Sequence, residues 1–208
     1  MAGNQYVQYG CGWSAPSGWR NFDASPTLRF ERLPIVGRLY TKNQERFPAN
    51  VEYGNIVRGL PIQNDSCAAV YCSHVLEHLA LNEFKLALRE TYRLLRKQGL
   101  FRLVVPDLKF GIEKYKTDQS GEAAMNFMRE MSLGLEHRER SMIGKVRLCF
   151  GNSQHLWMWD YASISRELEK CGFVEIRRAK FGDSSDSMFE DVEDPGRWKN
   201  CLGVECRK

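Results

Sequence analysis

Apolar and polar positions alternate along this chain with two periods, which predict strands and helices in turn. Residues 4–10, 18–23 and 49–56 are short segments that favour strands. Residues 66–73 form a nearly unbroken apolar run, which is typical of a strand covered on both faces. The first part of the chain therefore predicts four strands.

Residues 82–97 give the clearest helical pattern. One stripe of this segment is formed by Phe84, Ala87, Leu88, Thr91, Leu94 and Leu95. Arg96 and Lys97 suit the negative end of a helix dipole, and Gly99 then serves as the stop. We expect the helix to end just before Gly99.

A second strand–helix alternation occupies the rest of the chain. Residues 100–105 predict a buried strand that Pro106 ends, and residues 109–147 read as a long helical insertion. A short helix over Tyr161–Cys171 stops at Gly172, and residues 173–181 and 201–206 alternate like two closing strands. This order indicates an α/β sheet with a mostly parallel core.

Composition fits one domain over residues 1–208, with residues 109–147 as an insertion and candidate substrate lid. The 208 residues are 43% hydrophobic, enough for one substantial core. No apolar run reaches membrane-spanning length, and the polar first eight residues do not form a secretion signal. We expect no membrane span and a cytoplasmic protein.

The cysteine content also favours a cytoplasmic protein, and the charge distribution bears on its partners. The number of cysteines is odd and no Cys-x-x-Cys pair occurs, which favours buried thiols in a reducing compartment over a disulfide framework. These cysteines are Cys11, Cys67, Cys72, Cys149, Cys171, Cys201 and Cys206. The net charge of +4 is spread in sign, with no basic stripe interleaved with aromatics, so we expect no nucleic-acid partner.

Candidate ligand-binding residues follow the first three strands. Gly10 and Gly12 permit a tight turn and close approach of a ligand, although an ordinary turn explains them equally well. The full glycine-rich fingerprint and its following helix are missing, which disfavours nicotinamide and flavin cofactors. Asp23 could accept hydrogen bonds from ribose hydroxyls and Asn55 could bind an adenine edge, while both also fit turns.

Several longer segments together resemble class I S-adenosylmethionine (SAM)-dependent methyltransferases, in particular the type 11 or predicted SAM-dependent methyltransferase group. The most specific is residues 70–79, VYCSHVLEHL, which resembles the signature after the fourth strand. The others are residues 10–12 with 18–23 (GWRNFD), 99–108 (GLFRLVVPDL), 155–161 (HLWMWDY), and 181–184 with Val192 and Glu193.

The resemblance implies a Rossmann-like α/β fold: a seven-stranded, mostly parallel sheet with the last strand antiparallel and the helical insertion after strand five. It implies SAM as cofactor and S-adenosylhomocysteine as product, bound by Gly10, Cys11, Gly12, Asp23, Asn55, Ile56, Ser73 and His74. The chain departs from the family at Asn55, often Asp, at Ala68, often acidic, and in its shortened glycine motif.

His74, Glu77 and His78 also match the H-x-x-E-H pattern of inverted zincins. The pattern lies at a strand-to-helix turn, however, and no second acidic ligand helix follows. The methyltransferase reading explains this segment and four others, so we assign no metal ligand. Glu77 and His78 also fit a bracing role in the turn.

Candidate catalytic residues are Asp107, His155 and His74. Asp107 leaves a strand at its carboxyl end, and neutral His155 could take a hydroxyl proton. Candidate substrate-binding residues are Trp157, Trp159, Asp160, Tyr161 and Arg197. The alternatives are helix caps for Asp107 and Asp160, a structural role for His155, and core packing for the aromatics.

These residues favour methyl transfer to a small-molecule or glycan-type acceptor, at oxygen. Two alternatives stay open: a degenerate SAM-binding partner module, and a methyltransferase acting on RNA or protein. The missing basic appended domain and the Cys72-Ser73-His74-Val75 sequence, in place of an Asn-Pro-Pro-Tyr motif, count against RNA. A homodimer also stays open.

Overall fold

The computed structural model describes residues 4–34, 46–136 and 154–208. Its centre is a seven-stranded sheet in the order β3-β2-β1-β4-β5-β7-β6. The strands are β1 (Gln5–Tyr9), β2 (Arg20–Asp23), β3 (Val51–Tyr53), β4 (Cys67–Ser73), β5 (Leu95–Pro106), β6 (Val174–Ala179) and β7 (Cys201–Arg207). The pairs from β3 to β5 are parallel, and β7 is antiparallel to both neighbours. The predicted fold class is confirmed.

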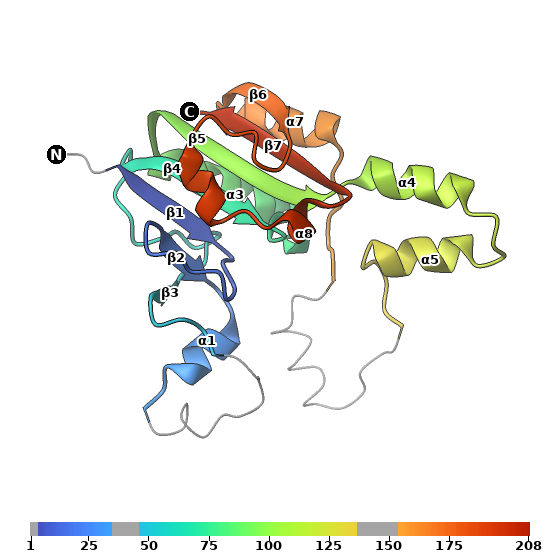
Figure 1. Ribbon diagram of the computed structural model, residues 1–208, viewed down its shortest axis with the longest axis horizontal. Coiled ribbons are helices and arrows are strands. Elements are labelled where there is room, and N and C mark those ends of the chain that lie inside the picture. The colour runs from blue at the N-terminus through green and yellow to red at the C-terminus, as the bar shows by residue number, and fades with distance from the viewer. Residues whose placement is uncertain (1–3, 35–45, 137–153) are drawn as a thin grey trace.

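Helices and short turns cover both faces of this sheet (Figure 1). They are α1 (Pro26–Glu31), η1 (Leu76–His78), α3 (Leu81–Leu94), α4 (Leu108–Thr117), α5 (Ala123–Glu130), α7 (Tyr161–Cys171), η2 (Ser187–Asp191) and α8 (Pro195–Trp198). Val70 and Cys72 of β4 join the core cluster that contains α3 and α7, whereas Ala69 and Tyr71 join the cluster that contains η2 and α8. The central strand is therefore buried on both faces, as its apolar run predicts.

The junction between α3 and β5 differs from the prediction. The buried stripe of the helix is correct, but α3 ends at Leu94, and Arg96 and Lys97 already belong to β5. Leu95 pairs with Cys67 of β4, so sheet pairing overrides the helical pattern there. Gly99 is not a helix stop: it lies within β5, where a Cβ would come 2.9 Å from the Arg96 carbonyl oxygen.

The predicted insertion contains two helices in its described part. α4 and α5 pack against each other and project from the sheet where β5 ends (Figure 1). Residues 137–147 of the predicted segment lie outside the described residues. No sequence signal had indicated α1, which begins at Pro26 behind the Ser25 N-cap. Residues 10–19, between β1 and β2, contain no helix, as expected.

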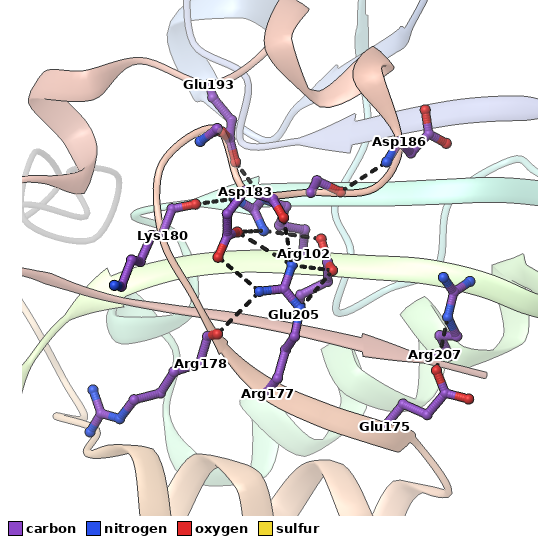
Figure 2. Close-up of polar contacts among 12 residues, drawn as sticks. Arg102, Glu175, Arg177, Arg178, Lys180, Asp183, Asp186, Glu193, Glu205 and Arg207 are labelled. Atoms are coloured by element: carbon purple, nitrogen blue, oxygen red, sulfur yellow. Dashed lines mark hydrogen bonds and ion pairs between the residues drawn. The ribbon is translucent and has the colours of Figure 1, made fainter.

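A buried charge network lies on the side of the sheet formed by β5, β7 and β6. Arg102 in β5 is fully buried and bonds Asp183 and Glu205 at 3.0 Å each, the Lys180 carbonyl oxygen at 2.6 Å, and Glu193 (Figure 2). The network ties β5 to β7 and to the loop after β6. Within the described residues, no helix is long and apolar enough to cross a membrane.

Candidate active site

A cavity of about 300 Å³ opens at the carboxyl ends of β1 to β4. Each strand end supplies at least one residue of its lining: Gly10 after β1, Asp23 at the end of β2, Asn55 and Ile56 after β3, and His74 after β4. Ligands bind at this edge of open α/β sheets. The sequence had named all five of these residues.

Gly10 is required by backbone conformation and by space. Its φ is +66°, in the left-handed region, and a Cβ there would lie 2.1 Å from Cγ2 of Val75. Gly12 also has a positive φ, +55°, but a Cβ there would meet open space. Of the two glycines in the motif, Gly10 is therefore the one whose missing side chain permits a close approach to its backbone.

Asp23 is fixed in place by its own backbone neighbourhood. Its Oδ2 accepts a hydrogen bond from Gly12 N at 3.0 Å, and its Oδ1 accepts one from Ser25 N at 2.7 Å. Each oxygen keeps a second lone pair, so the oriented carboxylate can also accept from ligand hydroxyls. Asn55 Oδ1 accepts from Val57 N at 2.9 Å, which leaves its amide nitrogen as the group it can offer.

Cys11, Gly12 and Ser73 are predicted cofactor residues that do not line the cavity. Cys11 is buried with Leu28, Phe47 and Val51, and this burial, with the nearby Asp23 charge, raises the pKa of its thiol to about 12. Ser73 is held instead by Arg197, whose guanidinium bonds its hydroxyl and its carbonyl oxygen.

His74 turns the chain out of β4 with a positive φ of 53°. Its Nδ1 lies 3.1 Å from Glu77 Oε1, and its Nε2 lies 2.9 Å from the carbonyl oxygen of Arg197. Burial opposes the charged ring, but hydrogen bonds to Cys201 and the Arg197 carbonyl oxygen, together with the nearby Glu77 carboxylate, outweigh it and raise the pKa of His74 to about 10. Arg197 thus fixes both Ser73 and His74.

Beside the cavity, Glu77, His78 and His155 form a cluster that we call the Glu77 group. The Glu77 carboxylate is 0% exposed, and neither oxygen meets a donor with hydrogen-bond geometry. His78 lines the cavity, and its Nε2 lies 4.0 Å from Glu77 Oε1. The His78 and His155 rings meet edge to face, with centroids 5.0 Å apart. Burial lowers the pKa of His155 and favours its neutral form.

Known methyltransferases resemble this chain both in sequence and in fold. Residues 26–103 match the family model of the methyltransferase domain, a stretch that includes the ends of β3 and β4. The fold also matches the crystal structure of a SAM-dependent methyltransferase from Archaeoglobus fulgidus, with a TM-score of 0.52 and 13% identity over 99% of this chain and 86% of that one. Residues 26–103 therefore resemble a methyltransferase domain in sequence, and the chain has the fold of a SAM-dependent methyltransferase.

A second methyltransferase structure has the same fold. It is described as a possible histamine N-methyltransferase from Thermotoga maritima, and it is 16% identical with a TM-score of 0.51, covering 98% of this chain and 82% of that one. No curated protein matches the chain. These likenesses establish the fold, and both structures are described as SAM-dependent methyltransferases. The Gly10 approach and the oriented Asp23 carboxylate suit such a nucleoside ligand.

The aromatic side chains of residues 157–161 lie in two different environments. Trp157 is 42% exposed, whereas Trp159 is 2% exposed and stacks on Phe84 with ring centroids 4.1 Å apart. The Tyr161 hydroxyl donates to the Ile176 carbonyl oxygen at 3.1 Å. Of these three aromatics, Trp157 offers an open ring face, while Trp159 has the core position that the pattern also allowed.

Asp107 and Asp160 are placed as helix N-caps. Asp107 Oδ1 accepts from Lys109 N at 2.9 Å, and its Oδ2 lies 3.6 Å from Nη1 of Arg178. Asp160 accepts from Ser163 N at 2.8 Å at the start of α7. The burial of Glu77 beside the cavity was not expected from the sequence. The H-x-x-E-H pattern was the signal, but its burial and its third neighbour, His155, depend on long-range folding.

Proposed function

We propose that this enzyme transfers a methyl group from SAM to a hydroxyl group of a small, sugar-like or ring-containing acceptor. SAM supplies an activated methyl group on a sulfonium, so the protein mainly has to orient the two reactants and deal with the hydroxyl proton. The Glu77 group carries this proposal, because it sets two imidazoles and a buried carboxylate beside the cofactor cavity.

Residues at the strand ends would hold SAM. Gly10 lets the backbone approach it, Asp23 accepts hydrogen bonds from the ribose hydroxyls, and Asn55 and Ile56 flank the adenine. His74, at the end of β4, would line the same site. This assignment uses the cavity-lining members of the predicted set and leaves Cys11, Gly12 and Ser73 in supporting positions.

The acceptor would bind next to His78, His155 and the open face of Trp157. An aliphatic or phenolic hydroxyl must lose its proton as the new C–O bond forms, whereas a neutral amine need not. The Glu77 group is suited to receive that proton, because the buried carboxylate stabilises positive charge on a neighbouring imidazole. We do not retain Asp107 or Asp160 in this role, since both carboxylates cap helices.

Cofactor binding tests the first half of the proposal. Isothermal titration with SAM should give one site, and Asp23→Asn should weaken binding by about tenfold to a hundredfold, because hydrogen bonds to charged groups contribute about 1.5–3 kcal/mol. Glu52→Gln is the matched control: this carboxylate lies on neighbouring β3 and pairs with Arg20 at the surface. Equal affinities in both variants would contradict the assignment of Asp23.

Acceptor chemistry tests the second half. Transfer of a radiolabelled methyl group would be measured with matched pairs of acceptors that differ only in carrying a hydroxyl or an amine, on sugar and phenyl frames. We expect turnover with the hydroxyl members and a rate that increases with pH as the acceptor ionises. Turnover confined to the amines would replace oxygen by nitrogen as the methylated atom.

A further inference from the structure

The carboxylate of Glu77, between the cavity-lining residues His74 and His78, is poorly satisfied. It is fully buried, and both of its oxygens lack a hydrogen-bond partner. Of the charged groups around it, His74 Nδ1 lies at 3.1 Å, outside hydrogen-bond geometry, and His78 Nε2 lies at 4.0 Å. The ion pair with His74 involves Oε1 alone, so Oε2 of this buried carboxylate still needs a partner such as a cation.

The two imidazoles beside it are arranged as ligands. Nδ1 of His78 lies 2.9 Å from the Gln154 carbonyl oxygen, which fixes the ring and leaves Nε2 free to coordinate. Nδ1 of His155 is buried without a hydrogen-bond partner. One ligand atom from each of Glu77, His78 and His155 lies within 4.8 Å of the others. Ligands about 2.0–2.2 Å from a shared metal ion would be separated by up to about 4 Å, so small side-chain rotations suffice.

The backbone holds the third ligand against the other two. Leu156 N and Trp157 N both donate to the Glu77 carbonyl oxygen, at 2.8 and 3.1 Å. His155 N donates to the Ser132 carbonyl oxygen at 3.1 Å. These bonds dock the segment after residue 154 onto η1 and fix the backbone position of His155.

We propose that Glu77, His78 and His155 bind a divalent transition-metal cation at the edge of the cofactor cavity. Two imidazoles and one carboxylate suit such cations and leave coordination positions open for a further ligand. The zincin pattern in the sequence pairs His74 with His78, whereas the proposed site pairs His78 with His155. His74 precedes η1 and its Nε2 faces the Arg197 carbonyl oxygen, so His155 takes the place that His74 would have had.

The role of the cation rests on the proposed function, although its binding does not. A bound cation would withdraw electron density from the acceptor hydroxyl and lower its pKa. With the cation bound, the imidazoles of the Glu77 group are ligands, so the hydroxyl proton passes to water instead of to that group. The oxygen forms its bond to the methyl carbon as the methyl–sulfur bond breaks, leaving S-adenosylhomocysteine. His78 lines the cavity, so the cation would lie between the SAM site and the acceptor.

The test is metal binding by the full-length, metal-free protein without SAM. Mn²⁺ is the main probe, because thiols elsewhere in the chain can bind Zn²⁺; Zn²⁺ and Mg²⁺ are compared with it. We expect one Mn²⁺ per chain by isothermal titration, and binding at least tenfold weaker in Glu77→Gln and in His155→Asn. His74→Asn is the matched control, which keeps all three ligands and should bind Mn²⁺ at least as tightly as the unmodified protein.

Two results would overturn the proposal. One is the absence of binding up to about 1 mM Mn²⁺, an affinity weaker than about 4 kcal/mol. The other is equal binding by the unmodified protein, Glu77→Gln and His155→Asn, which would indicate a surface site. SAM titration of the same variants separates this outcome from a failure of the proposed function, because the cofactor residues are unchanged in Glu77→Gln and His155→Asn.

Discussion

At the scale of single residues, Gly10 gives the most direct test of the cavity. Gly10→Ala should lose more stability than Gly12→Ala. Both replacements place a side chain at positive φ, which costs about 1–2 kcal/mol, but only the first drives a Cβ to 2.1 Å from Val75. Gly10→Ala should also weaken SAM binding, since Val75 lines the cavity.

Urea denaturation gives the two unfolding free energies, and isothermal titration gives the SAM affinity. If both variants lost the same free energy of unfolding, the close approach of Gly10 to Val75 would not matter. The two glycines are only two residues apart in one motif, so the sequence context of the control is nearly identical.

Residues that depend on local chain geometry were predictable from sequence. Gly10, Asp23 and Asn55 follow strands directly, and strand ends meet at one edge of a parallel sheet. Ser73 does not line the cavity for a physical reason: its hydroxyl is bonded by Arg197, 124 positions away. No local pattern reports such a contact, and the same holds for the approach of His155 to Glu77.

At the scale of elements, the start of α7 shows what Asp160 does. Asp160 and Ser163 form a reciprocal capping box, with Ser163 N donating to the carboxylate at 2.8 Å. Asp160→Ala should lower the free energy of unfolding by about 1 kcal/mol and leave the KM for the acceptor unchanged. Chemical denaturation and steady-state kinetics measure these two quantities. A raised KM without loss of stability would restore Asp160 to the acceptor site.

Element types were predicted better than element ends. α7 was predicted at its observed bounds because it has a cap, an apolar stripe and Gly172 in the left-handed conformation, φ +102°. The end of α3 was missed because an apolar residue at position 95 fits both a helical stripe and a buried strand. The pairing of Leu95 with β4 places it in the strand. Short α1 has too few residues to show a helical stripe.

At the scale of the whole molecule, the Arg102 network joins the two halves of the chain. Arg102→Met should lower the free energy of unfolding by about 3–5 kcal/mol, because it removes the arginine that pairs with buried Glu193 and one of the two arginines that pair with buried Glu205. Lys114→Met removes an equivalent charge from the exposed pair with Glu130 and should change stability far less. Urea denaturation measures both free energies of unfolding. If the two variants lost similar amounts, burial of the Arg102 ion pairs would not explain their contribution to stability.

The same network predicts a response to acid. Burial acts to raise the pKa of Asp183, but hydrogen bonds from Arg177 and Arg102 prevail and lower it to about 2. Because the folded pKa is depressed, this stabilisation is complete above the ordinary pKa of about 4 and is lost as pH falls towards 2. The free energy of unfolding should therefore fall more steeply from pH 4 to pH 2 in the unmodified protein than in Asp183→Asn. Parallel pH curves would exclude this carboxylate as a source of acid sensitivity.

The position of β7 has a consequence for synthesis of the protein on the ribosome. β7 lies between β5 and β6, and β6 pairs with no other strand of the sheet. While the chain is being made, β6 leaves the exit tunnel before β7, its partner in the sheet, has emerged. The Arg102 side chain likewise lacks its partner Glu205 until β7 emerges. The half that contains the cavity, from β1 to β5, can assemble during translation, since domains form as their segments emerge. The other half must wait until residues 201–207 are released, and until then β5 presents an open edge to other nascent chains.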